Sequence, residues 1–223
     1  MTNLQTPKTK AGRPTKNRAN GSKKIKKAAL YEFARGGFQG TSISQIAETA
    51  GVARPLIQHH FSGKEDLWKR AVSENYEEFI DSLKIAKENF IENDTEHNIQ
   101  LLSETLVKFA SENPFLIRII TDETRQNSDR ATWIRERYLL PVHVFAASLV
   151  ESMMSKSSLK ELNSIQANLI PVIFGALNFP FIDSDTISEV YAVDVYSKKY
   201  IQEHSNIISK LIKTLLMLSL IHI

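Results

Sequence analysis

Apolar residues recur along most of the chain at intervals of three and four positions, which places them on one face of an α-helix. This period predicts helices over 22–35, 43–50, 54–60 and 64–89, and further helices near 96–112, 114–126, 129–155, 159–182, 186–193 and 198–221. Residues 1–21 have no apolar periodicity, and no segment alternates in the way expected of a strand. We therefore predict an all-α protein preceded by a flexible N-terminal arm.

Capping residues and glycines divide these helices. Ser22 and Thr41-Ser42 stand where an N-cap is expected, and Gly36-Gly37 ends the first helix because glycine readily adopts the left-handed conformation there. Ser62-Gly63-Lys64-Glu65 has the form of a capping box at the start of the fourth helix. Two prolines are expected to kink the helices that contain them, Pro141 and Pro171.

The helices predicted over 43–50 and 54–60 are separated only by the turn Gly51-Val52-Ala53. Two short helices joined by a tight turn form a helix-turn-helix, whose second helix enters the major groove of DNA. Charge supports this assignment: residues 1–70 carry 14 Lys and Arg against 4 Asp and Glu, whereas residues 71–223 carry 14 against 21. A basic first third suits a polyanion, and the acidic remainder does not.

The composition limits the alternatives. Hydrophobic residues make up 42% of the 223-residue chain, which is enough for a packed core. The absence of cysteine excludes disulfides and thiolate metal sites and fits a reducing cytoplasm. No signal-peptide core and no run of about 18 apolar residues is present, so we expect no contact with a membrane. Motifs such as a nucleophile elbow, a P-loop or a zinc-protease helix are absent, and we predict a protein that is not an enzyme and uses no cofactor.

Short motifs follow one another at fixed spacing between Ile25 and Leu67: Ala28-Ala29 with Phe33, Gly37-Phe38, Thr41-Ser42-Ile43, Ile46-Ala47 with Ala50-Gly51-Val52, His60-Phe61, and Ser62 with Lys64-Glu65 and Leu67. This stretch closely resembles the DNA-binding domain of the TetR (tetracycline-repressor-like) family of bacterial regulators. The resemblance implies a basic arm (1–21), a helix-turn-helix DNA-binding domain (22–68) and a helical ligand-binding and dimerisation domain (69–223). The chain departs from the family pattern at Gln58, where tyrosine is usual, and at Glu32, where leucine is common.

The helix over 54–60 holds the candidate base-reading residues. Helical angles turn one side of it inward, namely Leu56, Ile57 and His60. The other side faces outward and comprises Arg54, Pro55 and Gln58, flanked by His59. Arginine pairs with guanine and glutamine with adenine, and each such contact contributes about 1–3 kcal/mol of discrimination. The alternatives are that Arg54 contacts phosphate or solvent and that Gln58 is merely exposed.

The resemblance also assigns contacts with the DNA backbone to Thr41, Lys64 and His60. The first two stand at predicted helix N-termini, where free N–H groups and the helix dipole favour an anion. For His60 a buried position with a hydrogen bond to the backbone is an equal alternative. His59 and His60 point about 100° apart on a helix and cannot chelate one ion together, so we expect no metal site.

The N-terminal arm contains Arg13 beside Pro14, with Lys16 and other basic residues around them. An Arg-Pro pair in a flexible basic arm can enter a narrow A·T-rich minor groove. Nonspecific attraction to phosphate is the alternative. In either case the affinity contributed by the arm should fall steeply as salt increases.

Two C-terminal segments are apolar on nearly all sides, Leu169–Ile182 and residues 211–221. One small subunit cannot cover both, and TetR-like proteins dimerise through their last two long helices, so we expect a homodimer that binds a palindromic operator. A core helix of a monomer is the alternative. The resemblance further implies a cavity for a small organic effector, and the candidate lining residues, which otherwise are plain core, are Phe109, Phe115, Arg118, Trp133, Tyr138, Phe145, Phe174 and Asn178.

These observations predict a ligand-responsive transcriptional repressor that binds double-stranded DNA and is released from its operator by a small organic molecule. We expect it in the cytoplasm, associated with the nucleoid. A ligand that binds best when the two DNA-binding domains are splayed apart would lower operator affinity. The alternative is an architectural, nucleoid-associated DNA-binding protein whose C-terminal domain recruits a protein partner.

Overall fold

The computed structural model describes residues 16–153 and 162–221 of the chain. Within these ranges every regular element is helical and no strand is present, which confirms the predicted all-α fold class. The elements are α1 (Lys16–Gly40), α2 (Ile43–Ala50), α3 (Arg54–His60), α4 (Lys64–Glu88), α5 (Thr95–Glu112), α6 (Pro114–Thr124), α7 (Asp129–Ile134), the π-helical η1 (Arg135–Leu139), α8 (Leu140–Met153), α9 (Leu162–Ile182), α10 (Ser184–Tyr191) and α11 (Lys198–Ile221).

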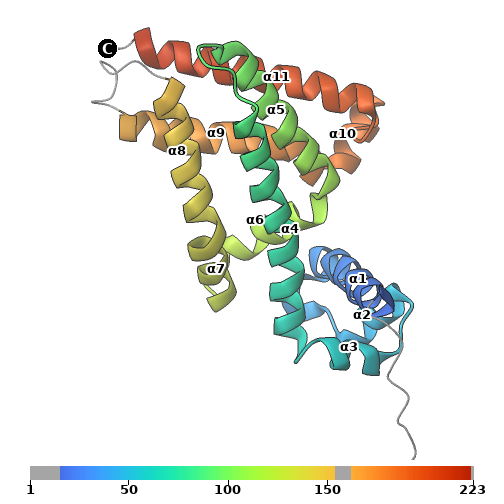
Figure 1. Cartoon of the computed structure of the whole chain (residues 1–223). Helices are drawn as coiled ribbons and strands as arrows, with labels where there is room; N and C mark the ends of the chain where they lie inside the picture. The colour runs from blue at the N-terminus through green and yellow to red at the C-terminus, as the bar shows by residue number, and fades with distance from the viewer. Residues whose placement is uncertain (1–15, 154–161, 222–223) are drawn as a thin grey trace, which may run out of the picture.

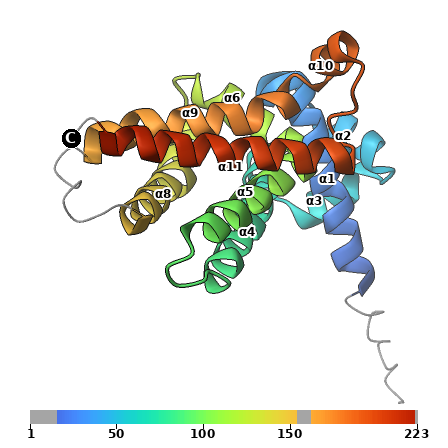
Figure 2. The same cartoon turned by 90° about the horizontal axis from the view of Figure 1, so that it is seen from above.

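The helices α1, α2 and α3 form a small unit at one end of the molecule, and α4 runs from this unit into a larger bundle (Figure 1). At the opposite end α9 and α11 lie side by side, and α11 also packs against α5 (Figure 2). No single described helix is long and apolar enough to span a membrane, although Ala167–Ile182 and Ser184–Tyr191, bent by 74°, meet that requirement together.

The first helix starts earlier than its capping pattern suggested. α1 begins at Lys16 rather than at Ser22, and Gly21 lies inside it. The predicted arm of residues 1–21 is therefore too long, because residues 16–21 are the first turns of α1. A β-carbon at Gly21 would lie 3.8 Å from both His60 Nε2 and Leu56 Cδ2 of α3. We attribute the extension to this packing, a long-range contact that no local cap signal reveals.

The break at Gly36-Gly37 falls where it was predicted. Gly37 has φ 66° and ψ 174°, a conformation essentially restricted to glycine. Thr41 is buried just after the bend, and its hydroxyl donates to the carbonyl oxygens of Gly37 at 2.8 Å and of Glu32 at 3.0 Å. The turn between α1 and α2 is thus set by one glycine and one threonine.

The capping box predicted at the start of α4 is wrong. Gly63, not Ser62, occupies the N-cap position, and no side chain caps the helix there. Instead, the backbone N–H of Ser62 donates to Asp66 Oδ2 at 2.9 Å. The helix starts one residue later than the S-x-x-E spacing requires, so the carboxylate of Asp66 replaces that of Glu65 in this contact.

The segment predicted as one helix over 129–155 is divided. α7 ends at Ile134, η1 follows, and the N–H of Leu140 donates to the carbonyl of Arg135, five residues earlier. Pro141 comes directly after this bond and has no N–H to donate, so the wider π-helical turn lies where the kink was expected. Pro171 lies inside α9, which continues through it to Ile182.

Two clusters of buried side chains hold these helices together. The second cluster joins α5, α9 and α11, with Val107, Leu177 and Ile208 among its members. The first cluster joins the inner faces of α1–α4 to α6, α7 and η1, and it includes Ile25, Phe33, Ile46, Trp68, Leu116, Ile134 and Tyr138. Because the first cluster is continuous, the three-helix unit is packed directly on the bundle and is not tethered to it by α4 alone.

Two glycine substitutions should have opposite effects on stability. Gly21→Ala should raise the free energy of unfolding by about 0.5–1 kcal/mol, because glycine is unfavourable inside a helix and the new β-carbon meets its neighbours at ordinary contact distance. Gly37→Ala should lower it by about 1–3 kcal/mol, since the backbone conformation disfavours alanine although nothing lies within 4 Å. Urea denaturation followed by circular dichroism measures both. Equal effects at the two sites would contradict the roles assigned to these glycines.

Candidate nucleic-acid interface and ligand cavity

The turn between α2 and α3 fixes the two helices relative to each other. Ser42 and Gln45 form a capping box at the start of α2, in which each backbone N–H donates to the side chain of the other residue. At the other end of α2, Gly51 has φ 63°, and its N–H donates to carbonyls of the last turn. α3 follows directly and is anchored by the buried Ile57. This arrangement is a helix-turn-helix.

The outward face of α3 carries the predicted base-reading residues, all of them exposed: Arg54, Pro55, Gln58 and His59. Leu56 is also exposed, at 37%, although helical angles predicted that it packs inward. The reason is that α3 is short and rests on the core through Ile57. The side that carries Leu56 and the half-buried His60 turns toward Gly21 in the first turns of α1.

The side chains of Thr41 and Lys64 are engaged inside the protein. Lys64 Nζ donates to the carbonyl oxygens of Phe38 at 2.7 Å and of Thr41 at 2.9 Å, and it lies 4.5 Å from the centre of the Phe38 ring. The Thr41 hydroxyl donates to two carbonyls, as described above. Both side chains therefore position the starts of α2 and α4, and a contact of either residue with DNA stays a prediction that rests on their backbone N–H groups.

Exposed lysines on α1 add positive charge beside α3. Lys23, Lys24 and Lys27 are exposed, whereas Lys26 pairs with Glu74 of α4. These lysines contribute to the basic charge of residues 1–70, but they are not among the predicted DNA-binding residues. Their exposure could have been predicted from the sequence, because they lie on the polar side of a helix whose apolar side includes the buried Ile25, Ala28 and Ala29. Arg13 and the side chain of Lys16 lie outside the described residues.

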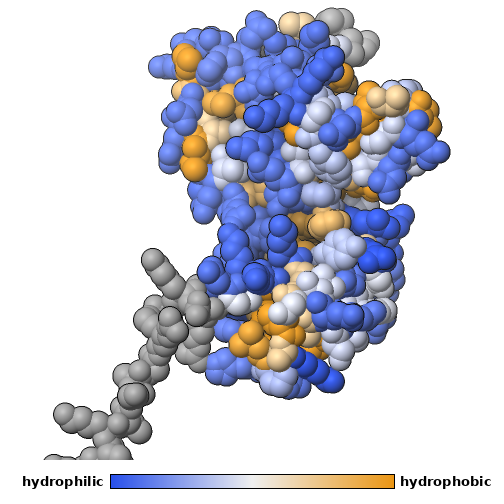
Figure 3. All heavy atoms as spheres, turned by 90° about the vertical axis from the view of Figure 1, so that its right-hand side faces the viewer, coloured by the Kyte–Doolittle hydropathy of each residue, from blue (hydrophilic) through white to orange (hydrophobic). Residues whose placement is uncertain are grey.

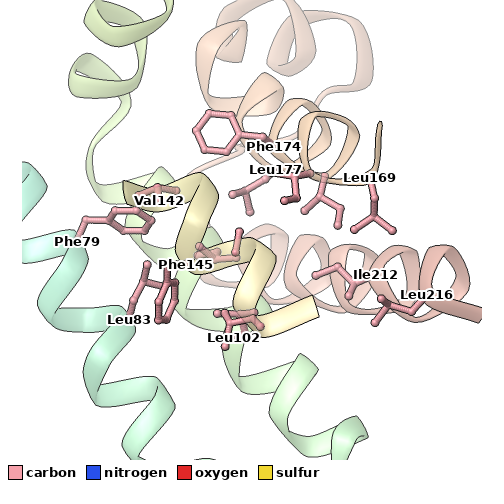
Figure 4. A pocket seen from close by; sticks show the side chains of 15 residues that line it. Phe79, Leu83, Leu102, Val142, Phe145, Leu169, Phe174, Leu177, Ile212 and Leu216 are labelled. Atoms are coloured by element: carbon pink, nitrogen blue, oxygen red, sulfur yellow. The ribbon is translucent and has the colours of Figure 1, made fainter. Parts of the chain in front are cut away.

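The bundle contains a cavity of about 100 Å³ between α4, α5, α8, α9 and α11. Side chains from all five helices point into it, and none of their lining groups is polar (Figure 4). Phe79 and Leu83 come from α4, and Phe145 comes from α8. A space with such walls accepts hydrocarbon and offers no partner to a charged group.

A smaller cavity of about 40 Å³ adjoins the first, with which it shares several wall residues, Phe174 and Leu177 among them. Leu116, Ile117 and Ile120 of α6 line its other side. Two of its lining residues carry polar groups, and both groups are engaged: Asn178 Nδ2 donates to the carbonyl of Phe174 at 2.8 Å, and the Tyr76 hydroxyl donates to the carbonyl of Tyr138. Through the shared wall residues, α6 lies next to the larger cavity.

Four of the eight predicted lining residues line these cavities: Phe109, Phe145, Phe174 and Asn178. The other four do not line these two cavities, and a contact of theirs with a ligand stays a prediction. Phe115 is exposed with its ring edge-on to Tyr31, and Arg118 lies on the surface beside Asp122. Trp133 packs against Trp68, and Tyr138 bonds Ser73 at the edge of a separate groove. Helical spacing indicates which side of a helix is apolar, but it does not indicate which neighbouring helix covers that side.

The outer face of α9 is apolar and exposed. Val172 and Phe179 are 53% and 58% exposed, and Gly175 between them faces open space. On α11 the exposed apolar residues are Ile207 and Met217. A separate hydrophobic patch protrudes over α10 and the turn after it (Figure 3), where Val190 and Val193 are exposed. Across the described residues, no group of His, Cys, Asp or Glu could hold a metal ion.

Comparison with known proteins agrees with this geometry. Residues 25–71 match the family model described as bacterial regulatory proteins, tetR family. The chain is 26% identical over 167 residues to the Probable HTH-type transcriptional regulator YttP of Bacillus subtilis, covering 75% of this chain and 80% of YttP. It is 36% identical over 77 residues to the HTH-type transcriptional regulator RutR of Escherichia coli, covering 34% of this chain and 36% of RutR.

Solved structures share the fold over most of the chain. The fatty acid degradation regulator FadR of Bacillus halodurans matches with a TM-score of 0.62 at 19% identity, over 87% of this chain and 97% of FadR. A TetR-like transcriptional regulator of Rhodococcus sp. RHA1 matches with a TM-score of 0.62 at 16% identity, over 91% of this chain and 97% of that one. A helix-turn-helix on a basic three-helix unit, packed on an all-helical bundle, defines a DNA-binding transcriptional regulator. Residues 25–71 form a DNA-binding domain of the TetR family, and the similarity over the rest of the chain supports a TetR-family regulator.

Proposed function

We propose that this regulator binds a palindromic operator as a homodimer and represses until a small apolar molecule enters its bundle. The proposal rests on the hydrocarbon-lined cavity and on the course of α4. α4 lines the cavity with Phe79 and Leu83 and begins at Lys64, next to the helix-turn-helix. A shift of α4 at the cavity therefore reaches the DNA-binding unit. Family members bind DNA and typically act as dimers.

The two parts of the chain are assigned different functions. We assign residues 22–68, together with the helical residues 16–21, to the DNA-binding domain and residues 69–223 to ligand binding and dimerisation. On α3, Pro55 and His59 lie opposite the buried Ile57 by helical angle, with Arg54 and Gln58 beside them. Arg54 suits guanine and Gln58 suits adenine.

The proposed effector is a small apolar molecule or one with a hydrocarbon chain. The larger cavity holds about 100 Å³, which is below the roughly 300–1,000 Å³ of typical ligand pockets. Binding must therefore widen the cavity by moving its walls. A ligand that prefers the widened bundle shifts the protein toward the conformation that contains it. FadR is named for fatty acid degradation, and an acyl chain would also suit the walls of this cavity.

The proposed dimer interface is the outer face of α9 with the adjoining face of α11. Its apolar residues are exposed in the single chain, with Gly175 at the centre of the α9 stripe. Hydrophobic surface of this extent is costly to leave in water. Twofold symmetry of the dimer places two copies of α3 on two half-sites, which is why the operator is expected to be palindromic.

Substitutions on α3 and α1 should separate base reading from phosphate contact. Arg54→Ala and Gln58→Ala should each relax base preference at one operator position and cost about 1–3 kcal/mol on the preferred sequence. Lys24→Gln should weaken all sequences alike and reduce the slope of log affinity against log salt by about 1. Selection of duplexes from a random pool, followed by affinity measurements over a salt series, tests this. Lys26→Gln, which removes the partner of Glu74, is the matched control.

The dimer is tested at Gly175. Gly175→Arg should give a monomer, because in the single chain the new side chain meets open space but in the dimer it would place a charge in an apolar interface. Gly175→Ala should keep both the fold and the dimer. Sedimentation equilibrium gives the mass of each variant, and circular dichroism checks the helix content. A dimeric Gly175→Arg protein would place the interface elsewhere, and a monomeric parent protein would refute the homodimer.

The effector proposal is tested by filling the cavity. Saturated fatty acids of medium and long chain are the probes, and those that bind should lower operator affinity. Ala146→Leu places a larger side chain in the cavity wall and should abolish that effect while leaving DNA binding without ligand unchanged. Val144→Leu, on an exposed position of the same helix, is the control. If the probes act equally on all three proteins, they do not act through this cavity.

A further inference from the structure

Arg130, in the first turn of α7, links the bundle to the DNA-binding unit. One of its terminal nitrogens lies 3.0 Å from Glu123 Oε1 of α6, and the two side chains are only 16% and 8% exposed. Ser128 donates to the same carboxylate oxygen at 2.6 Å. Glu123 thus holds Arg130 in place and compensates its charge, which a side chain so far from water requires.

The other contact of Arg130 is with the end of α1. The centre of its guanidinium lies 3.9 Å from the centroid of the Phe38 ring, close enough for a strong cation–π contact. Lys64 Nζ makes a second cation–π contact with this ring, 4.5 Å from its centroid. Phe38 is therefore held by two cations, one from the start of α4 and one from the bundle.

Phe38 is well placed to control the helix-turn-helix. It follows the bend at Gly37, and its carbonyl accepts from Lys64, which also bonds the carbonyl of Thr41 just before α2. Whatever fixes the Phe38 ring fixes this bend and, through it, the start of α2. The influence of Arg130 extends to α4 as well: the pKa of the Glu65 carboxyl lies below its ordinary value, mainly through a hydrogen bond and charge from Lys69 and to a smaller degree through the charge of Arg130.

On the bundle side, Arg130 is tied to the wall of the cavity. Glu123 lies in the last turn of α6, and Leu116, Ile117 and Ile120 of the same helix line the smaller cavity. A shift of α6 at those residues moves Glu123 because one continuous helix carries all of them.

The contact between Arg130 and Phe38 is not tightly packed. A hollow of about 190 Å³ lies beside it, lined among others by Gly36, Gln39, Gln126 and Trp68. Arg130 Nε is buried and has no hydrogen-bond partner in the described part of the chain. A buried donor without a partner is costly, and the adjacent space leaves room for a second arrangement of the side chain.

We propose that Arg130 is a positioning residue that sets the orientation of the helix-turn-helix relative to the bundle by holding Phe38, and that movement of α6 regulates this hold through Glu123. The first half depends only on the contacts of Arg130. The second half rests on the proposed ligand response and supplies its route to DNA.

The orientation is measurable because the chain contains no cysteine. Ser44 on α2 and Lys108 on α5 are exposed. Ser44→Cys with Lys108→Cys therefore allows two spin labels, one in the DNA-binding unit and one in the bundle. Dilution with unlabelled protein keeps the distance within one chain. Arg130→Met, which keeps length but loses charge, should broaden or shift the distance distribution and weaken affinity for the selected duplex about tenfold.

Arg130→Lys keeps the ion pair with Glu123 but not the planar group over Phe38, and it should give an intermediate distribution. Arg125→Met removes a surface arginine that pairs with Asp122 and should change neither measurement. If Arg130→Met leaves the distance distribution unchanged, the proposal is overturned, whatever happens to affinity. If Arg130→Met fails to fold, Phe38→Leu and Arg130→Lys provide the same comparison.

The ligand-dependent half has its own readout. A fatty acid that lowers operator affinity should shift the distance distribution of the parent protein and have little further effect on Arg130→Met. Failure of every probe to alter DNA binding would refute the ligand response but not the role of Arg130, because the distance in the absence of ligand tests that role directly. A ligand shift of equal size in both proteins would overturn the route through Arg130.

Discussion

The burial of Trp68 is the interaction on which the rest of the structure depends. Trp68 lies on α4 and is almost completely buried, with its ring edge-on to Phe38 of α1 at 6.3 Å and tilted against Trp133 of α7 at 5.6 Å. An aromatic side chain of this size buries about 150–250 Å², and each Å² contributes roughly 25 cal/mol. Because that burial needs both α1 and α7, the stabilisation from Trp68 is complete only when the DNA-binding unit is docked on the bundle. The polar contacts of Arg130 lie within this apolar interface between the DNA-binding unit and the bundle. We propose that they set the orientation of the unit relative to the bundle.

The features of the DNA-binding unit that could be predicted from sequence are those with local causes. The bend at Gly37, the cap at Ser42 and the left-handed turn at Gly51 each depend on residues a few positions away. The early start of α1 could not be predicted in this way, because it comes from the packing of α1 against α3. The exposure of Leu56 could not be predicted either, because it depends on how α3 rests on the core through Ile57. Long-range packing overrides local signals whenever the two disagree.

The residues that line the cavities show the same limit of prediction from local sequence. Phe145 lines the larger cavity and Phe109 the smaller one, whereas Phe115 and Arg118 line neither, although all four lie in segments that were correctly predicted to be helical. A period identifies the apolar side of a helix but not the element that it packs against. α6 shows this difference: Leu116 and Ile120 line the smaller cavity, whereas Phe115 is exposed beside Tyr31 of α1. Only the arrangement of the helices in space separates these roles.

The small size of the cavity would favour coupling between ligand binding and operator binding. A ligand larger than about 100 Å³ must displace its walls, and packed interiors respond by changing between discrete arrangements because they cannot deform continuously. A tenfold loss of operator affinity requires a difference of about 1.4 kcal/mol between the two arrangements. A desolvated cation–π contact is worth about 0.5–2 kcal/mol, so loss of the contact between Arg130 and Phe38 is of the size required. The hollow beside that contact offers space for the displaced side chains, and this is why we place the two arrangements at the contact between Arg130 and Phe38 and not at the cavity wall.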